Sequence, residues 1–377
     1  MTLAAFLAAG AASAQPDRPR VRDLGVHLGV LTPGKWNAIT DVDGVRVGHR
    51  TIVEGASIRT GVTAVLPHPG NVFRRKVPAA VWVGNGFGKA AGFLQVKELG
   101  NLETPIVLTN TLAIAPAIEA LVSWTITRPG NEEVRSVNAV VGETNDGRLN
   151  DIRARRVTAR DVTAAIEAAA SGPVAEGGVG AGTGTVAFGW KGGIGTSSRV
   201  LPERLGGWTV GVLVQSNFDG VLTIDGVRVG ELFGRYAFRK EIEGVTDLPE
   251  GGSCMIVVAT DAPLSSRNLE RIARRALFGL ARTGSFMDNG SGDFAIAFST
   301  KNLEEHEPKA RLRTVEEVNN DSVGPLFLAT VEAVEEAVVN SLTKATTVTG
   351  YRGRTVEALP IDRLRELLAK RPTPSRR

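Results

Sequence analysis

The sequence contains a single cysteine, Cys254, and only four histidines among its 377 residues. One thiol excludes an intramolecular disulfide, and no His/Cys spacing resembles a metal site. None of the histidines (His27, His49, His68 and His306) lies in a G-x-S-x-G context, so the sequence offers no sign of a Ser-His-Asp triad.

Long apolar runs and one-sided charge are also absent. The 44 basic and 40 acidic residues are interspersed and form no basic stripe, which argues against nucleic-acid binding. The one notable apolar run, residues 1–14, ends in Ala12-Ser13-Ala14 and is too short to span a bilayer. An A-x-A-like end before Gln15 is typical of a signal peptide, so we expect a periplasmic or secreted protein with no membrane anchor.

The pattern of what remains predicts a layered α/β protein. Hydrophobic residues make up 42% of the chain, and apolar strand patterns mix with amphipathic helical spacing. Residues 219–252 are expected to form a surface loop with one hairpin. The expected strands cover 38–53, 60–67, 77–85, 105–110, 136–147, 207–217, 254–264 and 294–300. The expected helices cover 112–126, 158–172, 265–284 and 321–345.

A glycine-rich segment, residues 177–195, contains Gly180-Ala-Gly182-Thr-Gly184. A dinucleotide site would need this loop between a strand and a helix N-terminus, with an acidic residue about twenty positions later. A strand-like TVAFGW follows instead, and no such acidic residue is found at the end of a second strand. The segment therefore favours a tight turn whose glycines allow close approach to a neighbour or a substrate.

A second glycine pair, Gly251-Gly252, precedes Ser253 at the start of an apolar strand. Such a junction is commonly an ordinary loop end, but it also permits self-cleavage. The Ser253 hydroxyl can attack the Gly252 carbonyl, and a glycine there leaves the strained approach unobstructed. Hydrolysis of the ester would leave Ser253 as a new N-terminus whose α-amine, with a pKa of roughly 7.7–8.0, can act as the base. The neighbouring Cys254 is a rival nucleophile, but strand alternation points it away from Ser253.

Taken together, the motifs resemble the L-aminopeptidase/D-esterase family, which includes the β-peptidyl aminopeptidases. The resemblance runs in order from about residue 23 to 365. Its segments include NAITDVDGVRVGH (37–49), NGFGK (85–89), VVGETNDGRLNDIR (140–153), GAGTGTVAFGWKGGIGTSSR (180–199), VGVLVQSN (210–217), GGSCMIVVATDAPL (251–264) and RTGSFMDNGSGDFAIAFST (282–300).

This resemblance implies an αββα sandwich, shared with the ornithine acetyltransferases, that is self-cleaved into two chains. We therefore expect a signal peptide at 1–14, an α chain at 15–252 and a β chain at 253–377, with both chains in one domain. It also implies no metal, no cofactor, and assembly as a homo-oligomer, commonly a tetramer of αβ units.

The family's site residues carry over to named positions here. The resemblance implies Ser253 as nucleophile, Ser291 and Asp293 as its relay partners, and Asn217 as the oxyanion residue. Ser291 and Asp293 could hydrogen-bond the Ser253 ammonium or hydroxyl, although an Asn-Gly-Ser-Gly-Asp turn is the simpler structural explanation of that segment. Some members have glutamate where Asp293 stands.

An aminopeptidase must also bind the ammonium of its substrate, which a carboxylate does best. The resemblance implies Glu143 for this role, and Asp146 is a competing candidate. Some members have a catalytic-site tyrosine shortly after this acidic stretch. Here the only tyrosines are Tyr236 and Tyr351, and Arg148 stands nearby.

These observations predict a self-processing serine aminopeptidase that acts on small peptides, amides or esters, with either β- or α-amino-acid preference. One alternative is an acyltransferase of the ornithine-acetyltransferase fold, in which an amine acceptor would outcompete water. Another is a periplasmic binding protein that never cleaves, which would leave the mature chain intact.

Overall fold

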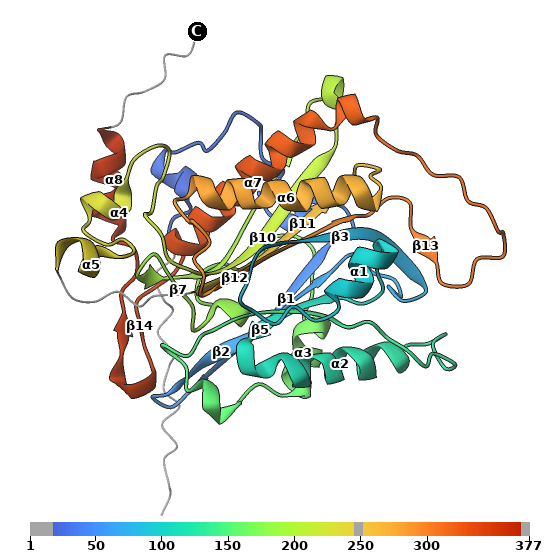
Figure 1. Cartoon of the computed structure of the whole chain (residues 1–377), viewed down its shortest axis with the longest axis horizontal. Coiled ribbons are helices and arrows are strands. Elements are labelled where there is room, and N and C mark those ends of the chain that lie inside the picture. The colour runs from blue at the N-terminus through green and yellow to red at the C-terminus, as the bar shows by residue number, and fades with distance from the viewer. Residues whose placement is uncertain (1–17, 245–251, 371–377) are drawn as a thin grey trace, which may run out of the picture.

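A computed structural model describes residues 18–244 and 252–370. The expected signal peptide and the chain's last seven residues lie outside the described residues. Two sheets stack face to face in the middle of the molecule, and helices cover both outer faces (Figure 1). The expected mixed α/β architecture is confirmed, and its layers are helix, sheet, sheet, helix.

The larger sheet holds the strands that matter for the site. Its strand order is β13-β3-β12-β11-β10-β9, and β4 also pairs with β3. β11 and β12 run parallel, whereas β10 is antiparallel to β11 and β3 is antiparallel to β12. The bounds are β3 (Arg75–Gly86), β4 (Asn101–Leu102), β9 (Gly193–Val200), β10 (Thr209–Asn217), β11 (Gly252–Thr260), β12 (Ser291–Ser299) and β13 (Glu304–Glu305).

The smaller sheet has the order β1-β2-β5-β6, with β5 and β6 parallel. Its bounds are β1 (Arg46–Glu54), β2 (Ile58–Leu66), β5 (Ile106–Asn110) and β6 (Val140–Thr144). Two short hairpins stand apart from both sheets: β7 (Val186–Ala187) with β8 (Trp190–Lys191), and β14 (Val348–Thr349) with β15 (Thr355–Val356).

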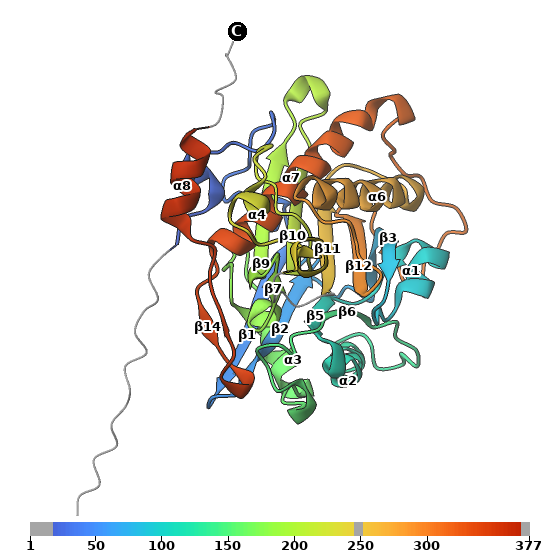
Figure 2. The ribbon, with the colours of Figure 1, turned by 60° about the vertical axis from the view of Figure 1, so that its left-hand side comes forward.

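Helices α6 (Ser266–Arg282) and α7 (Gly324–Thr343) cover the larger sheet, and α2 (Ile114–Ile126) and α3 (Ala159–Glu167) cover the smaller one (Figures 1 and 2). α6 connects β11 to β12 and α2 lies between β5 and β6, because parallel neighbours need a crossover long enough to hold a helix. The remaining helices are α1 (Phe93–Leu99), α4 (Val229–Leu232), α5 (Arg239–Glu243) and α8 (Ile361–Ala369).

Alternation along β11 fills two different cores. Met255 and Val257 pack between the sheets, whereas Cys254, Ile256 and Val258 pack beneath the helices. The N-cap residues of α3 and α6 are Thr158 and Ser265, the residues at which these two helices were expected to begin. No helix within the described ranges is long and apolar enough to cross a membrane.

Three expectations about elements were wrong. Residues 219–252 contain the short helices α4 and α5 rather than only turns. β12 begins at Ser291, so the NGSGD segment enters the strand instead of forming only a turn before it. The strand expected in TVAFGW is instead a hairpin of two short strands, β7 and β8. Its bend holds Phe188 and Gly189 at φ values of 52° and 74°.

Candidate active site

Ser253 lies where three strands of the larger sheet meet. It pairs with Asn217 at the end of β10 on one side and with Gly292 at the start of β12 on the other. Its side chain is only 4% exposed. Segments that are 36 or more positions apart in sequence thus meet at the sheet edge that the ends of these central strands form.

The Ser253 hydroxyl lies against the peptide bond that it is expected to attack. Ser253 Oγ donates a hydrogen bond of 2.5 Å to the carbonyl oxygen of Gly252. A Cβ on residue 252 would come within 2.4 Å of both Asn217 O and Phe218 Cα. Glycine at 252 is therefore required by the packing of the backbone against the end of β10 as well as by the freedom of the junction.

Ser291 and Asp293 lie on the strand next to Ser253, but their register partners are Gly252 and Cys254. Since side chains alternate along a strand, Asp293 shares the helix-covered face with Cys254, and Ser253 faces the smaller sheet. Ser291 Oγ and both Asp293 carboxylate oxygens have no hydrogen-bond partner among the described residues. The predicted bonds from this pair to Ser253 are not formed in the single chain, and their formation after cleavage stays a prediction.

Burial raises the pKa of Asp293 to about 6, and the nearby Ser291 hydroxyl opposes the rise. That hydroxyl thus influences the carboxyl without meeting the geometry of a hydrogen bond. Burial, together with the charge of Asp293, also raises the pKa of the Cys254 thiol well above its usual range. A thiol that stays protonated is a poor nucleophile, which argues against Cys254 as the rival of Ser253.

Asn217 has one half of its amide already engaged. Its Oδ1 accepts a hydrogen bond of 3.0 Å from the backbone N–H of Val186 in β7. Because the oxygen is turned toward Val186, the amide NH₂ is the half left to act as a donor elsewhere. A free amide donor at this position is what the predicted oxyanion role of Asn217 would need.

Glu143 comes from the other sheet, near the end of β6, and is buried. Its Oε1 accepts a hydrogen bond of 3.0 Å from Lys89 N, and its Oε2 accepts one from the Thr111 hydroxyl. Gly88 links it to the nucleophile, since a Cβ there would lie 3.3 Å from Glu143 Oε1 and one on Gly292 would lie 3.1 Å from Gly88 Cα. Glu143 and the partner strand of Ser253 thus meet across Gly88.

Asp146, the competing candidate, has other partners. Its Oδ1 accepts a hydrogen bond of 2.9 Å from Asn150, and burial raises its pKa to about 7. The positive charge of Lys191 opposes this rise in the pKa of Asp146. Neither Tyr236 nor Tyr351 lies next in sequence to this acidic stretch, and Arg148 is exposed to solvent.

The comparisons with known proteins agree with this arrangement. Residues 37–356 match peptidase family S58. The chain belongs to peptidase family S58. It is 42% identical to beta-peptidyl aminopeptidase BapA of Sphingosinicella microcystinivorans, over 98% of this chain and 96% of that protein. As a family member it is a serine peptidase, which excludes a binding protein without catalytic activity.

Two solved structures in this family are close in fold. The beta-aminopeptidase of a Burkholderia species has a TM-score of 0.86 and 43% identity, covering 94% of this chain and 100% of that one. The L-aminopeptidase D-Ala-esterase/amidase of Ochrobactrum anthropi has a TM-score of 0.85 and 40% identity, covering 94% and 99%. That protein is described as a prototype serine aminopeptidase with a variant of the Ntn-hydrolase fold.

Asn85 lies beside the predicted site residue Asp293, although the sequence gave no sign of a role for it. Its Nδ2 donates to the carbonyl oxygens of Asp288, Asn289 and Ser291, at 2.9, 3.1 and 2.5 Å. It also pairs with Asp293 next to an irregularity in the β3–β12 register. Asn85 therefore shapes the turn that leads into Ser291. The one available signal was its place in the NGFGK segment.

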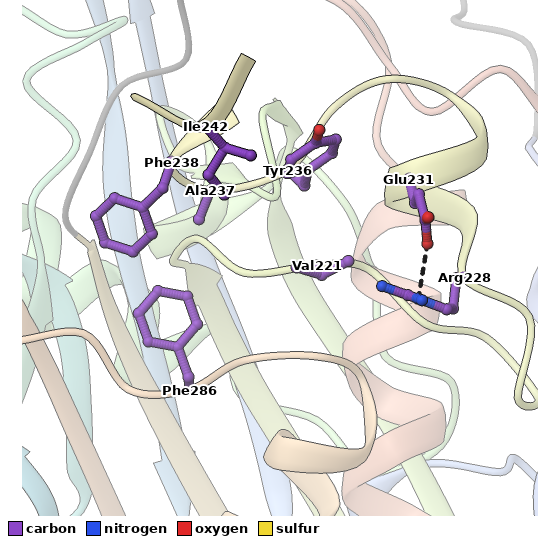
Figure 3. A pocket seen from close by; sticks show the side chains of 8 residues that line it. All are labelled: Val221, Arg228, Glu231, Tyr236, Ala237, Phe238, Ile242 and Phe286. Atoms are coloured by element: carbon purple, nitrogen blue, oxygen red, sulfur yellow. Dashed lines mark ion pairs between the residues drawn. The ribbon is translucent and has the colours of Figure 1, made fainter. Parts of the chain in front are cut away.

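An apolar pocket of about 410 Å³ lies beside the segments that flank the site (Figure 3). The Phe238 and Phe286 rings lie on one side of it with centroids 5.7 Å apart, and the Arg228–Glu231 ion pair lies on the other. Val221 follows β10, Phe238 precedes β11, and Phe286 precedes β12. The walls thus come from two connections, the one between β10 and β11 and the one between α6 and β12, which lead from Asn217 toward Ser253 and into Ser291.

No group of three or more His, Cys, Asp or Glu side chains suited to hold a metal ion occurs within the described ranges.

Proposed function

We propose that this S58 peptidase is made as a precursor that cleaves itself between Gly252 and Ser253, and that it then removes N-terminal residues from small peptides, amides or esters. The observation that carries the proposal is the Ser253 hydroxyl held against the Gly252 carbonyl, 2.5 Å from its oxygen, beside Asn217. Family membership supplies the reaction class.

Self-cleavage follows from these groups in three steps. Ser253 Oγ attacks the Gly252 carbonyl carbon and gives up its proton, which passes to the departing Ser253 nitrogen; the Asp293 carboxylate, on the other face of the sheet, is our candidate to stabilise the charge that this nitrogen gains. The carbon–nitrogen bond breaks, the nitrogen takes up a proton, and Gly252 is left as an ester on Ser253. Water then hydrolyses the ester, which yields a Gly252 carboxylate and a free Ser253 amine and hydroxyl.

The backbone nitrogen of Ser253 lies in the plane of the sheet, so it can be approached from either face. This supports contact between the new α-amine and Ser291 or Asp293 even though the Ser253 side chain faces the smaller sheet. In the mature enzyme the neutral amine would take the proton of Ser253 Oγ. Asn217 Nδ2 would stabilise the oxyanion of the acyl-enzyme's tetrahedral intermediates.

Glu143 would bind the substrate's ammonium group. Its buried carboxylate, across Gly88 from the partner strand of Ser253, supports recognition of a free N-terminus close to the nucleophile. The named relatives suggest β-amino-acid N-termini as first substrates, with L-α-amino-acid amides as the next class. The apolar pocket of Figure 3 suits an apolar side chain on the leaving part of the substrate.

The proposal extends to organisation and location. Residues 15–252 and 253–377 would be the α and β chains of one αββα domain, after removal of residues 1–14 during export to the periplasm or medium. The interleaving of β10, β11 and β12 supports two chains that remain together after cleavage. Assembly into a homo-oligomer, commonly a tetramer of αβ units, is part of the same proposal.

The direct test is a comparison of amide substrates that differ in the N-terminal residue. Purified protein is incubated with β-alanyl, L-alanyl and N-acetyl-L-alanyl p-nitroanilide, and p-nitroaniline release is followed. Release from one or both free-amine substrates and none from the acetylated control is expected. Equal release from the acetylated substrate would contradict an aminopeptidase.

A further inference from the structure

The site residues described so far leave the glycine-rich segment, residues 177–195, without a role. Its first glycines form the 3-10 turn η5 (Gly180–Gly182), and the β7–β8 hairpin follows in place of a helix. A dinucleotide would need a helix N-terminus at this point, so that interpretation is wrong. The turn and the hairpin instead surround a buried lysine.

Lys191 is fully buried, with a relative exposure of 0%. Its Nζ donates hydrogen bonds of 2.8 Å to the carbonyl oxygens of Gly182 and Gly192. These carbonyls lie before β7 and after β8, so one ammonium group fastens both ends of the hairpin. A backbone bond of 3.1 Å from Gly192 N to Thr185 O closes the same loop.

The hairpin is attached directly to the end of β10. Val186, the register partner of Lys191, donates its N–H to Asn217 Oδ1 at 3.0 Å. At the bend, Phe188 N donates to Phe218 O at 2.8 Å. Every link from the lysine to the Asn217 amide is therefore a hydrogen bond or a strand pair of the described chain.

A buried lysine of this kind is not explained by the stability of the fold alone. It forms no ion pair with a carboxylate of the described residues, and burial lowers its pKa to about 7, with Asp146 the charge that opposes the shift. Taking an ammonium out of water without a contacting carboxylate is unfavourable for folding. A methionine could fill the volume without that cost, but it could not hold two carbonyls.

We infer that Lys191 is a positioning residue for the oxyanion amide: by fixing the β7–β8 hairpin it holds the Val186 N–H on Asn217 Oδ1, which presents Asn217 Nδ2 to the oxygen that develops beside Ser253. The inference rests on the proposed function of Asn217. The glycines of the segment allow the close backbone approaches that seat the hairpin, since a Cβ on Gly182 would lie 2.4 Å from Ile194 N and one on Gly192 would lie 2.5 Å from Ser216 O.

The test is steady-state kinetics on Lys191→Met, Lys191→Arg and Asn217→Ala, with rates counted per processed chain. Lys191→Met should lower kcat about 10²-fold and leave KM within about twofold, because losing one oxyanion donor costs about 10²–10³-fold. Lys191→Arg keeps the charge and should recover about tenfold of that loss. In an Asn217→Ala background, Lys191→Met should add less than about threefold, because both changes remove the same interaction.

Lys76→Met is the matched control. Lys76 is a largely buried lysine on β3 whose Nζ donates a hydrogen bond of 2.6 Å to Glu103, and neither residue takes part in the contacts between Lys191 and Asn217. The kcat of this control should stay within about twofold of wild type. If Lys191→Met does not fold, Val186→Pro removes the N–H that bonds Asn217 and leaves the lysine in place, and it should show the same loss of kcat.

Fully additive losses in the double variant, or a raised KM with unchanged kcat, would overturn the inference. Failure of the proposed function has a different signature, since a Ser253→Ala protein would then retain activity. A wild type that depends on Ser253 while Lys191→Met turns over normally would remove only the inference.

Discussion

Arg199 and Lys191 are both fully buried beside the larger sheet, yet their surroundings differ sharply. Arg199 contacts carboxylate oxygens of Glu332 at 3.0 Å and Glu336 at 2.8 Å, and it also donates to the carbonyl oxygens of Leu28 and Ser198. Lys191 has two carbonyls and no contacting carboxylate among the described residues. One cation is fully matched by opposite charge, and the other is not.

The difference separates charges that hold the fold from charges that set up the site. Arg199 joins α7 to β9 and to the N-terminal segment, far along the sheet from its reactive edge. Lys191, Asp293 and Ser291 lie toward that edge and have incomplete pairing. Ser291 Oγ and both Asp293 oxygens are buried without a hydrogen-bond partner among the described residues, as is common for groups of active sites.

The largest effect expected on the site side of this comparison is that of Ser253→Ala. Without the hydroxyl the chain should stay uncut, and activity should fall by at least about 10⁴-fold, because both self-cleavage and the acyl-enzyme need the Ser253 oxygen. The melting temperature should change by less than about 3 °C. Gel analysis, activity and calorimetry on one preparation check all three, and an active, uncut variant would disprove the nucleophile's identity.

On the structural side, Arg199→Met should cost about 3–5 kcal/mol of the free energy of unfolding. The substitution leaves Glu332 and Glu336 buried without their shared cation. The activity of each folded, processed molecule should stay within about threefold of wild type. Urea unfolding measures the first quantity and active-site titration the second. A large loss of kcat with unchanged stability would reverse the comparison.

Glu143→Gln should separate substrate binding from self-cleavage. The amide is nearly the same shape but lacks the charge that pairs with an ammonium group, so kcat/KM should fall about 10–100-fold, mainly through KM. Self-cleavage uses no free ammonium in that pocket, and its rate should stay within about twofold. Asp146→Asn serves as the comparison, and a larger loss of binding there would transfer the role to Asp146.

The pH dependence of processing tests the incomplete pairing of Asp293. Since burial raises its pKa to about 6, the carboxylate form that can stabilise the departing Ser253 nitrogen predominates above that pH. The rate of precursor cleavage should level off above about pH 6 and fall about tenfold for each pH unit below it. Following cleavage of freshly refolded precursor between pH 4 and 8 measures this, and Asp293→Asn should process slowly with no such rise. An unchanged profile in that variant would assign the titration to another group.

The smallest effect is expected from the apolar pocket. Phe286→Ala should raise KM about three- to tenfold for a substrate with an aromatic leaving residue, because it removes one of the two facing rings. A substrate with a glycine leaving residue should show no change beyond about twofold. Equal changes for both substrates would mean that the pocket does not hold the leaving residue.

Much of the fold could be predicted because its signals are local. Alternation predicted β10 and β11 and pointed Cys254 away from Ser253, and the helices expected from residues 158 and 265 begin there, with Thr158 and Ser265 as N-caps. Helix α8 was missed, because its nine residues have only Leu364 and Leu368 fully buried. The β7–β8 hairpin was read as one strand because its bend depends on the positive φ of Phe188, which no local pattern announces.

The candidate site divides in the same way. Ser253 was found because its chemistry needs only its own neighbour, Gly252. The register that pairs Ser253 with Gly292 rather than with Ser291 depends on how two distant strands align, and one sequence does not contain that information. Asn85 and Lys191 act through backbone carbonyls, so their roles have no signature in residue type or spacing.

The most direct measurement is the intact mass of the purified protein under denaturing conditions, with N-terminal sequencing of each species. Self-cleavage predicts two chains, of which the second begins at Ser253 and ends at residue 377, in equal amounts. A single chain that spans residues 252 and 253 in a fully active preparation would contradict the proposal that Ser253 works as an N-terminal nucleophile.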